Sequence, residues 1–255
     1  VETVGTIKIE DMKMFVVNRF ARDNLVLSVV GDIKAPTLEA AIDDVFGNLR
    51  DKATPWKLEE VRPNSLRKAV VIQKRIPQSV IRFAQEGVKR DDPDFYSAYV
   101  MNYVLGGGGF ASRLYQEVRE RRGLAYSAFS YLLPFKAAGL ILGGAGTANM
   151  KLSETLKVLR DEWRRMSEIG LSEEELENAK SYLTGSYPLR FTSSRKIAST
   201  LTGIQLARLG IDYVKKRNGI INKVSLEDIK RVAKRILDVD KLTLVVVGQP
   251  GKVMP

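Results

Sequence analysis

The sequence predicts an α+β protein, made of duplicated layered domains in which helices pack on a mostly antiparallel sheet. Two observations lead to this fold class. Strand-like runs occur in pairs flanked by helical segments, and they are followed by a helical block and a returning strand. A helix followed by a β-branched run that closes on glycine also appears near both ends of the chain.

The second observation is an internal repeat with an offset of about 217 residues. Residues 10–31 align without a gap with residues 227–248, with about nine identities in 22 positions. In each copy an acidic start leads into an apolar stripe and then into a β-branched run before Gly31 or Gly248. Self-similarity at this long period indicates duplication of a domain-sized unit, and coincidence between two helix-strand units is the alternative.

The repeat sets the expected domain organisation. Because the second copy ends near the C-terminus, residues 1–50 are predicted to be the C-terminal remainder of a first α+β domain, with roughly 150 residues of that domain before Val1. Residues 51–66 carry two prolines, high charge and no periodicity, which is typical of an exposed linker. Residues 67–255 are predicted to form a nearly complete second α+β domain without a metal site.

The elements follow from local hydrophobic patterns. Ser172 and Glu175 have the spacing of a capping box at the start of a helix. An apolar stripe with helical spacing covers Leu152, Leu156, Leu159, Trp163 and Met166. In chain order, the sequence predicts a helix over 35–49, strands over 68–74 and 80–86, helices over 92–104 and 112–121, a hairpin of 126–133 with 139–146, a helical block, and a strand over 242–247.

Composition limits the chemistry that this chain can perform. Its 255 residues include no histidine and no cysteine, so an imidazole base, a thiolate or a His/Cys metal site must come from elsewhere. No run approaches the roughly 20 apolar residues that cross a bilayer, and residues 1–13 do not have the order of a signal peptide. The net charge of +11 would suit nucleic acid or acidic peptides. However, Arg164, Arg165 and similar residues alternate with acidic ones, which favours solvated helix faces over a nucleic-acid interface.

A four-glycine loop precedes the predicted helix over 112–121. Gly106, Gly107, Gly108 and Gly109 invite a phosphate-loop interpretation, but no Lys-Ser/Thr pair follows them and no G-x-G-x-x-G opens a βαβ unit. Two interpretations stay open. The loop is either a flexible connector between helices, or a place where an extended ligand approaches bare backbone.

Arg119 and Tyr126 flank the end of this helix. Arg119 lies in its last turn, Gly123 supplies the helix stop, and Tyr126 opens the next strand, so the two side chains can converge. Arginine offers fixed donors to a carbonyl or carboxylate, and a tyrosine hydroxyl can stabilise an oxyanion. The alternative is that Arg119 pairs with Glu117 or Glu120 while Tyr126 is a half-buried strand aromatic.

Four segments together resemble the pitrilysin (insulinase-type) zinc metallopeptidases. They are SRLYQEVRERRGLAYS at 112–127, the preceding GGGG, the final helix-strand-glycine unit, and FARDNLVLSVVGDI at 20–33. The resemblance covers nearly the whole chain, and its most specific element is the R-x6-Y spacing in ERRGLAY. It implies a fold of the LuxS/processing-peptidase type. The family's H-x-x-E-H zinc helix cannot exist in a chain without histidine.

The resemblance therefore implies the metal-free half or subunit of such a peptidase. Arg119 and Tyr126 would complete, in trans, an active site whose zinc lies in a partner half, and Gly106–Gly109 would bind the extended peptide substrate. No cofactor is expected in this chain, and neither nucleic acid nor a membrane is an expected partner. The resemblance favours the bacterial periplasm as the location, with the cytoplasm as the alternative. Self-association of an isolated fragment stays open. A non-catalytic scaffold subunit and a basic nucleic-acid-binding module are the alternative functions.

Overall fold

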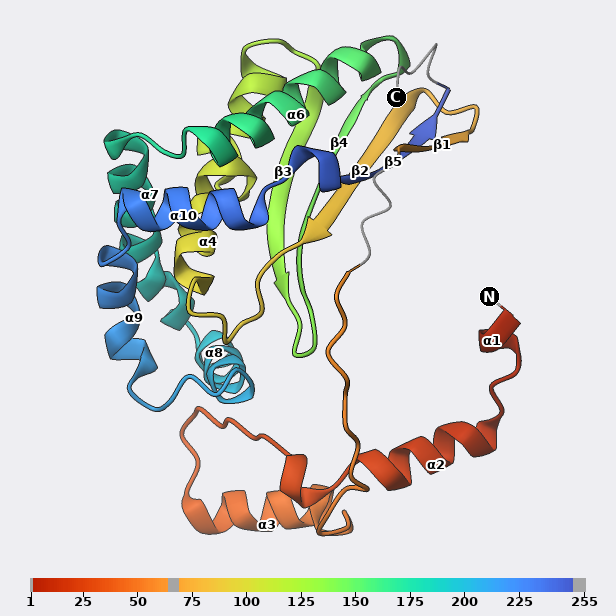
Figure 1. Cartoon of the computed structure of the whole chain (residues 1–255). Helices are drawn as coiled ribbons and strands as arrows, with labels where there is room; N and C mark the ends of the chain where they lie inside the picture. Colours follow the sequence, from red (N-terminus) through yellow and green to blue (C-terminus); the bar gives the residue numbers. More distant parts are fainter. Residues whose placement is uncertain (1, 64–68, 250–255) are drawn as a thin grey trace. The chain divides into compact units, whose positions relative to one another are not determined.

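The computed structural model describes residues 2–63 and 69–249 (Figure 1). The chain divides into two compact units. Unit 1 comprises Val1–Leu58 and Pro188–Tyr213, and unit 2 comprises Glu59–Tyr187 and Val214–Pro255. Residues 51–63 of the predicted linker form neither helix nor strand, while residues 64–66 lie outside the described part of the chain. The domain organisation inferred from the repeat stays a prediction.

Unit 2 is built on a five-stranded sheet, whose order in the described residues is β1-β5-β2-β4-β3. Only β1 and β5 pair in parallel; the other neighbouring strands are antiparallel. The α+β fold class with a mostly antiparallel sheet is therefore confirmed, and so is the predicted hairpin. The strands are β1 (Ala69–Gln73), β2 (Gln78–Glu86), β3 (Ala125–Pro134), β4 (Gly139–Ala148) and β5 (Thr243–Gly248).

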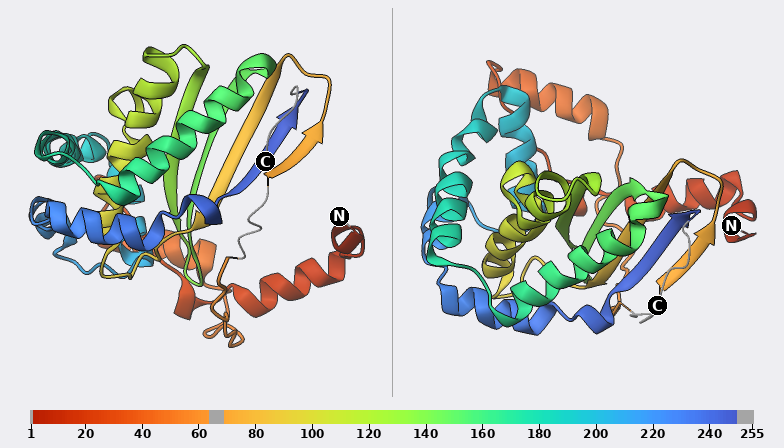
Figure 2. Two further views of the ribbon diagram at one scale, coloured as in Figure 1. Left: turned by 45° about the horizontal axis from the view of Figure 1, so that its top comes forward. Right: turned by 90° about the horizontal axis from the view of Figure 1, so that it is seen from above.

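The core of unit 2 lies between one face of this sheet and three helices. Alternate residues of β2, from Ser79 to Gln85, are buried, as the two-residue period of a strand requires. Figure 2 shows α4 (Phe95–Asn102), α6 (Leu152–Glu168) and α10 (Leu226–Ile236) on this side of the sheet. Trp163 of α6 packs edge-on against Phe83 at 5.3 Å between ring centroids, and its indole N–H donates to the Gln85 side chain at 3.1 Å.

The remaining helices of unit 2 follow the predicted patterns. The apolar stripe of α6, from Leu152 to Met166, is buried as predicted. The capping box is also confirmed, because the Glu175 amide donates to Ser172 Oγ at 3.1 Å and the Ser172 amide donates to the Glu175 carboxylate at 2.9 Å. This box starts α7 (Glu173–Gly185), and α9 (Tyr213–Asn222) precedes α10. No described helix has both the length and the apolar character of a membrane span.

Unit 1 contains α1 (Glu2–Gly5), α2 (Ile9–Arg19), α3 (Ala35–Phe46) and α8 (Ser194–Leu206). It is held mainly by polar and backbone contacts. Ala21 and Arg50 form an isolated bridge, the Thr54 amide donates to the Asn18 carbonyl at 2.9 Å, and the Arg19 guanidinium lies 4.7 Å from the Trp56 ring centroid. Neither α2 nor α3 buries a residue.

The two copies of the repeat share local structure up to the point where the second copy forms its strand. α2 begins and ends at the positions equivalent to the bounds of α10, and a short 3-10 turn follows each, at Arg22–Asn24 and Val239–Lys241. Residues 243–248 then form β5, whereas residues 25–30 are not a strand. The predicted first-copy strand is therefore wrong. β5 lies between β1 and β2, and the first copy has no such neighbours in the described chain to bond its backbone.

The two helices of the repeat differ most in burial. In α10 the apolar face, including Ile229 and Val232, is fully buried because it packs on α4 and α6. The equivalent side chains of α2, Met12 and Phe15, are 54% and 56% exposed. The helix thus has a partner surface in unit 2, and its counterpart has none in the described part of unit 1.

The repeat supplies a matched pair of substitutions. Ile229→Ala is expected to lower the free energy of unfolding of unit 2 by about 2 to 5 kcal/mol, because it leaves a cavity in a packed core. Met12→Ala, at the equivalent position, is expected to change stability by less than about 0.5 kcal/mol. Urea unfolding followed through Trp163 fluorescence for unit 2 and Trp56 fluorescence for unit 1 measures both effects. Equal costs would contradict the exposed state of the α2 face.

Candidate functional site

Tyr126 lies in a break of the β3–β4 ladder. Ala125 pairs with Thr147 and Ser127 pairs with Gly146, so Tyr126 has no partner of its own across the ladder. Such a bulge turns a side chain away from the regular alternation. The Tyr126 side chain is consequently 80% exposed, which contradicts the half-buried strand aromatic considered as an alternative.

Arg119 reaches the same place from the preceding helical segment. A single α-helical turn at Arg113–Tyr115 passes into a π-helical turn at Gln116–Glu120, a conformation that is found often at functional sites. The Arg119 guanidinium carbon lies 4.8 Å from the ring centroids of both Tyr126 and Tyr115. Its contact with Glu120 is longer than a hydrogen bond, at 3.7 Å between Nε and Oε1. The structure therefore brings Arg119 and Tyr126 together.

Hydrogen bonds fix the backbone that connects Arg119 to Tyr126. Gly123 adopts a φ of +56°, which favours glycine, and its amide donates to the Arg119 carbonyl at 2.9 Å. The Leu124 amide then donates to the Val118 carbonyl at 2.8 Å, and the Thr147 hydroxyl donates to the Leu124 carbonyl at 2.6 Å. The helix stop expected at Gly123 is confirmed, and it fixes the path from Arg119 to the bulge.

An ion pair between the buried Arg113 and the partly exposed Glu175 anchors the start of the same helical segment. Both Nε and Nη2 of Arg113 donate to the Glu175 carboxylate at 2.6 Å, and Nη2 also donates to the Gly170 carbonyl at 2.8 Å. The Arg113 side chain is only 8% exposed. This bidentate pair joins the helical segment to α7 with two charge-assisted hydrogen bonds.

The carboxylate of Glu117 is the hydrogen-bond acceptor for the two arginines that follow soon after Arg119. Glu117 is buried and accepts hydrogen bonds from Arg121 and Arg122. Burial alone would raise the pKa of the Glu117 carboxyl, but the hydrogen bond from Arg122 and the charges of Arg121 and Arg122 hold that pKa below its usual value. Because Glu117 is occupied by these two residues, it does not pair with Arg119. The other half of the alternative interpretation is confirmed, since Arg119 forms an ion pair with Glu120 at 3.7 Å.

Close packing accounts for three of the four loop glycines. Gly106 lies within a π-helical turn at Tyr103–Gly107 and against β3, where a Cβ atom would come within 2.4 Å of Ser130 Oγ. A Cβ at Gly107 would meet Asn102 Nδ2 at 2.8 Å, and one at Gly108 would meet the Tyr103 carbonyl oxygen at 2.8 Å. Gly109 has open space around it, with a φ of +58°. A substrate-binding role for Gly106–Gly109 stays a prediction.

Sequence reasoning missed several residues that surround Arg119. The exposed Phe110 ring follows the glycine loop and lies 6.0 Å from the Arg119 guanidinium carbon. Tyr115 was not predicted to be part of the site, although its position four residues before Arg119 places both on one helix face. The Arg113–Glu175 pair spans too great a distance along the sequence for any spacing rule to predict it.

The donors present here are suited to binding oxygen atoms of a ligand. A guanidinium and a phenol hydroxyl can donate to a carbonyl or an oxyanion, but neither is a metal ligand of the His/Cys type. Within residues 2–63 and 69–249, no group of three or more acidic side chains is placed to hold a metal ion. The site as described is a pair of hydrogen-bond donors on a partly apolar, aromatic surface.

The family follows from comparison with known proteins. The family model described as "Peptidase M16 inactive domain" matches residues 6–183. The chain belongs to this family, which confirms the resemblance inferred from the motif, and it is an inactive domain of a protein related to zinc proteases.

Relatives of this chain include both proteases and a non-peptidase. An uncharacterized zinc protease of Streptomyces coelicolor is 28% identical over 93% of this chain and 53% of its own length. A Helicobacter pylori protein named as a non-peptidase homolog is 26% identical over 98% of this chain and 58% of its own length. The chain thus spans somewhat more than half the length of these relatives.

Solved structures share the fold. A peptidase M16 inactive domain from Pseudomonas fluorescens superposes with a TM-score of 0.86 and 29% identity, over all of this chain and 60% of that one. A chain of complex III2 from Candida albicans superposes with a TM-score of 0.75 and 19% identity, over 97% of this chain and 60% of that one. The second likeness concerns the fold alone.

The partly buried Arg113–Glu175 ion pair predicts a dependence of stability on pH. Burial would raise the pKa of the Glu175 carboxyl, but the hydrogen bonds from Arg113 and from the Ser172 amide lower it overall. A lowered folded-state pKa stabilises the protein above the unfolded-state value near 4.5, and this contribution is lost as the pH falls through the folded-state value. Glu175→Gln is expected to cost about 2 to 4 kcal/mol near pH 7, and much less near pH 3.

Chemical denaturation of both proteins at the two pH values measures this difference. Asp161→Asn, in the exposed pair of Asp161 with Lys157, is the control and is expected to cost less than about 1 kcal/mol at either pH. If Glu175→Gln destabilised the protein equally near pH 7 and near pH 3, the ionised pair would not be the source of the stability.

Proposed function

We propose that this chain is the metal-free half of an M16 peptidase and completes a zinc site carried by a partner half. The observation that supports this most directly is the convergence of Arg119 and Tyr126, with the Tyr126 ring exposed at a strand bulge. The partner half is either a separate subunit or another part of a longer chain. It would contain the H-x-x-E-H helix that a chain without histidine cannot have.

In this proposal Arg119 binds a carbonyl oxygen of the peptide substrate. Its guanidinium is partly exposed, and its longer contact with Glu120 leaves N–H donors available. The rings of Tyr115 and Tyr126 hold the guanidinium plane by cation–π contact, which restricts its motion without using its donors. Because the substrate carbonyl is present before and during the reaction, Arg119 contributes to binding as well as to the rate.

Tyr126 would act mainly in the transition state. When water attacks a peptide carbonyl, the oxygen becomes an oxyanion, and a preorganised hydroxyl donor is most useful at that moment. The bulge and the helix stop at Gly123 hold the tyrosine in place in advance. Zinc in the partner would activate the attacking water and polarise the carbonyl.

The substrate would lie along β3. This strand is at one edge of the sheet in the described residues, and an extended peptide can add to such an edge through backbone hydrogen bonds. Gly109, which has open space around it and lies next to Phe110, would let the peptide approach the loop closely. The net charge of +11 favours acidic peptides.

The kinetic test uses this chain mixed with a zinc-bearing M16 half. Tyr126→Phe is expected to lower kcat by a factor on the order of 10² to 10³ with little change in KM, because the hydroxyl is needed mainly in the transition state. Arg119→Ala is expected to lower kcat and raise KM. Tyr182→Phe, on α7 and also exposed, is the control and should leave both constants unchanged. The chain alone should neither cleave peptides nor retain stoichiometric zinc in elemental analysis.

A non-catalytic scaffold is the second candidate function. A relative named as a non-peptidase homolog and a likeness to a chain of complex III2 favour it. The two candidates differ in one result. If the reconstituted complex forms and cleaves peptides at an unchanged rate with both Arg119 and Tyr126 replaced, the chain is a scaffold.

A further inference from the structure

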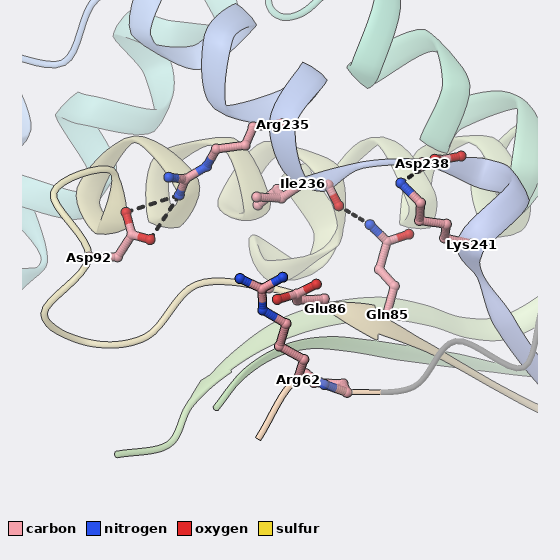
Figure 3. A pocket seen from close by; sticks show the side chains of 10 residues that line it. Arg62, Gln85, Glu86, Asp92, Arg235, Ile236, Asp238 and Lys241 are labelled. Atoms are coloured by element: carbon pink, nitrogen blue, oxygen red, sulfur yellow. Dashed lines mark hydrogen bonds and ion pairs between the residues drawn. The ribbon is translucent and has the colours of Figure 1, made fainter. Parts of the chain in front are cut away.

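A polar cavity of about 420 Å³ lies in unit 2, far from the Arg119–Tyr126 site (Figure 3). Its walls come from the linker at Arg62, from the end of β2 at Glu86, and from the end of α10 and the following turn at Arg235, Asp238 and Lys241. The volume is within the range of about 300 to 1,000 Å³ that is usual for small-molecule sites.

The register of the sheet separates the two sites. Glu86 pairs with Leu140 at one end of β2, whereas Gln78 pairs with Ala148 at the other end. Ala125, the residue before Tyr126, pairs with Thr147. Tyr126 therefore lies at the Gln78 end of β2. Nine strand residues at about 3.4 Å each place Glu86 roughly 27 Å from the Tyr126 end of the sheet. The cavity is therefore independent of the proposed peptidase site.

An ion pair and several hydrogen bonds hold the walls of the cavity in place. Glu60 and Lys89 form an ion pair at 2.5 Å, and the Val61 amide donates to the Ala137 carbonyl at 2.9 Å, so the linker is tied to unit 2 just before Arg62. The buried Gln85 side chain donates to the Ile236 carbonyl and accepts from the Trp163 indole. One wall is thus a fixed polar surface whose own hydrogen bonds are satisfied.

The charged side chains of the cavity fall into two groups. Arg235 bonds to Asp92 at 2.9 Å, and Lys241 pairs with Asp238 at 3.0 Å, so these four charges are balanced locally. Arg62 and Glu86 are different, because no hydrogen bond or ion pair joins either side chain to another described residue. Figure 3 shows the Arg62 guanidinium and the Glu86 carboxylate turned towards the same space.

We propose that this cavity binds a small zwitterion, namely a free α-amino acid or a short peptide with both ends charged. An anion alone would bind Arg62 but face Glu86, and a cation alone would bind Glu86 but face Arg62. An apolar ligand would remove water from both charges and offer no partner in return. A zwitterion satisfies both, with its carboxylate on the guanidinium fork and its ammonium on the carboxylate.

Isothermal titration of this chain with the dipeptide Ala-Ala tests the proposal. Ala-Ala is expected to bind saturably at millimolar concentration, and its N-acetylated, C-amidated form about tenfold or more weakly, because it lacks both end charges. Arg62→Gln and Glu86→Gln are each expected to weaken binding of Ala-Ala about tenfold. Both residues are exposed, so these variants are expected to keep the wild-type unfolding midpoint.

Glu59→Gln is the matched control, since Glu59 lies on the same linker, is exposed and does not line the cavity. It should bind Ala-Ala as the wild type does. The proposal is overturned if Ala-Ala gives no saturable signal up to about 10 mM, if the blocked dipeptide binds equally well, or if folded Arg62→Gln and Glu86→Gln retain wild-type affinity. None of these outcomes depends on peptidase activity, so they leave the proposed function of Arg119 and Tyr126 untouched.

Discussion

The candidate site depends on the way in which buried arginine and glutamate side chains hold one short helical segment. Arg113 binds Glu175 and the Gly170 carbonyl from the start of the segment, and Glu117 binds Arg121 and Arg122 near its end. A buried guanidinium without its carboxylate would be costly, so the segment has little freedom to turn or slide. Arg113 thus anchors the segment to α7, the Glu117 pairs brace the segment internally, and Arg119 is directed towards the bulge at Tyr126.

The internal repeat shows that the local signals that start and end a helix do not decide whether the helix is buried. α2 and α10 begin and end at equivalent positions and have equivalent N-terminal hydrogen bonds, from the Lys8 amide to Asp11 and from the Ser225 amide to Asp228. Helix formation is local, and both sequences specify it. Burial and strand formation need a neighbouring surface, and only the second copy has one in the described chain.

The sequence was enough to predict the key residues of the site, Arg119 and Tyr126, but not the tertiary contacts that hold them in place. The spacing of Arg119, Gly123 and Tyr126 indicates convergence, because a helix stop followed directly by a strand leaves few paths between them. The bulge that exposes Tyr126 follows from the register of β3 on β4, which no local signal reveals. Likewise, Gly106 packs so closely on Ser130 that a side chain at this position would clash. This steric reason for glycine does not involve a ligand.

The fold class, the strands of unit 2, the capped helices, the family and the absence of histidine and cysteine chemistry could all be predicted, because motifs, periodicity, capping and composition can be recognised within short stretches of sequence. Three features are visible only in the tertiary structure. They are the choice of which helix faces are buried, the pairing of Arg113 with Glu175 across 62 positions of sequence, and the placement of Arg62 and Glu86 in one cavity. These features depend on contacts between segments that are distant in the chain, and such contacts leave no periodic trace in the sequence.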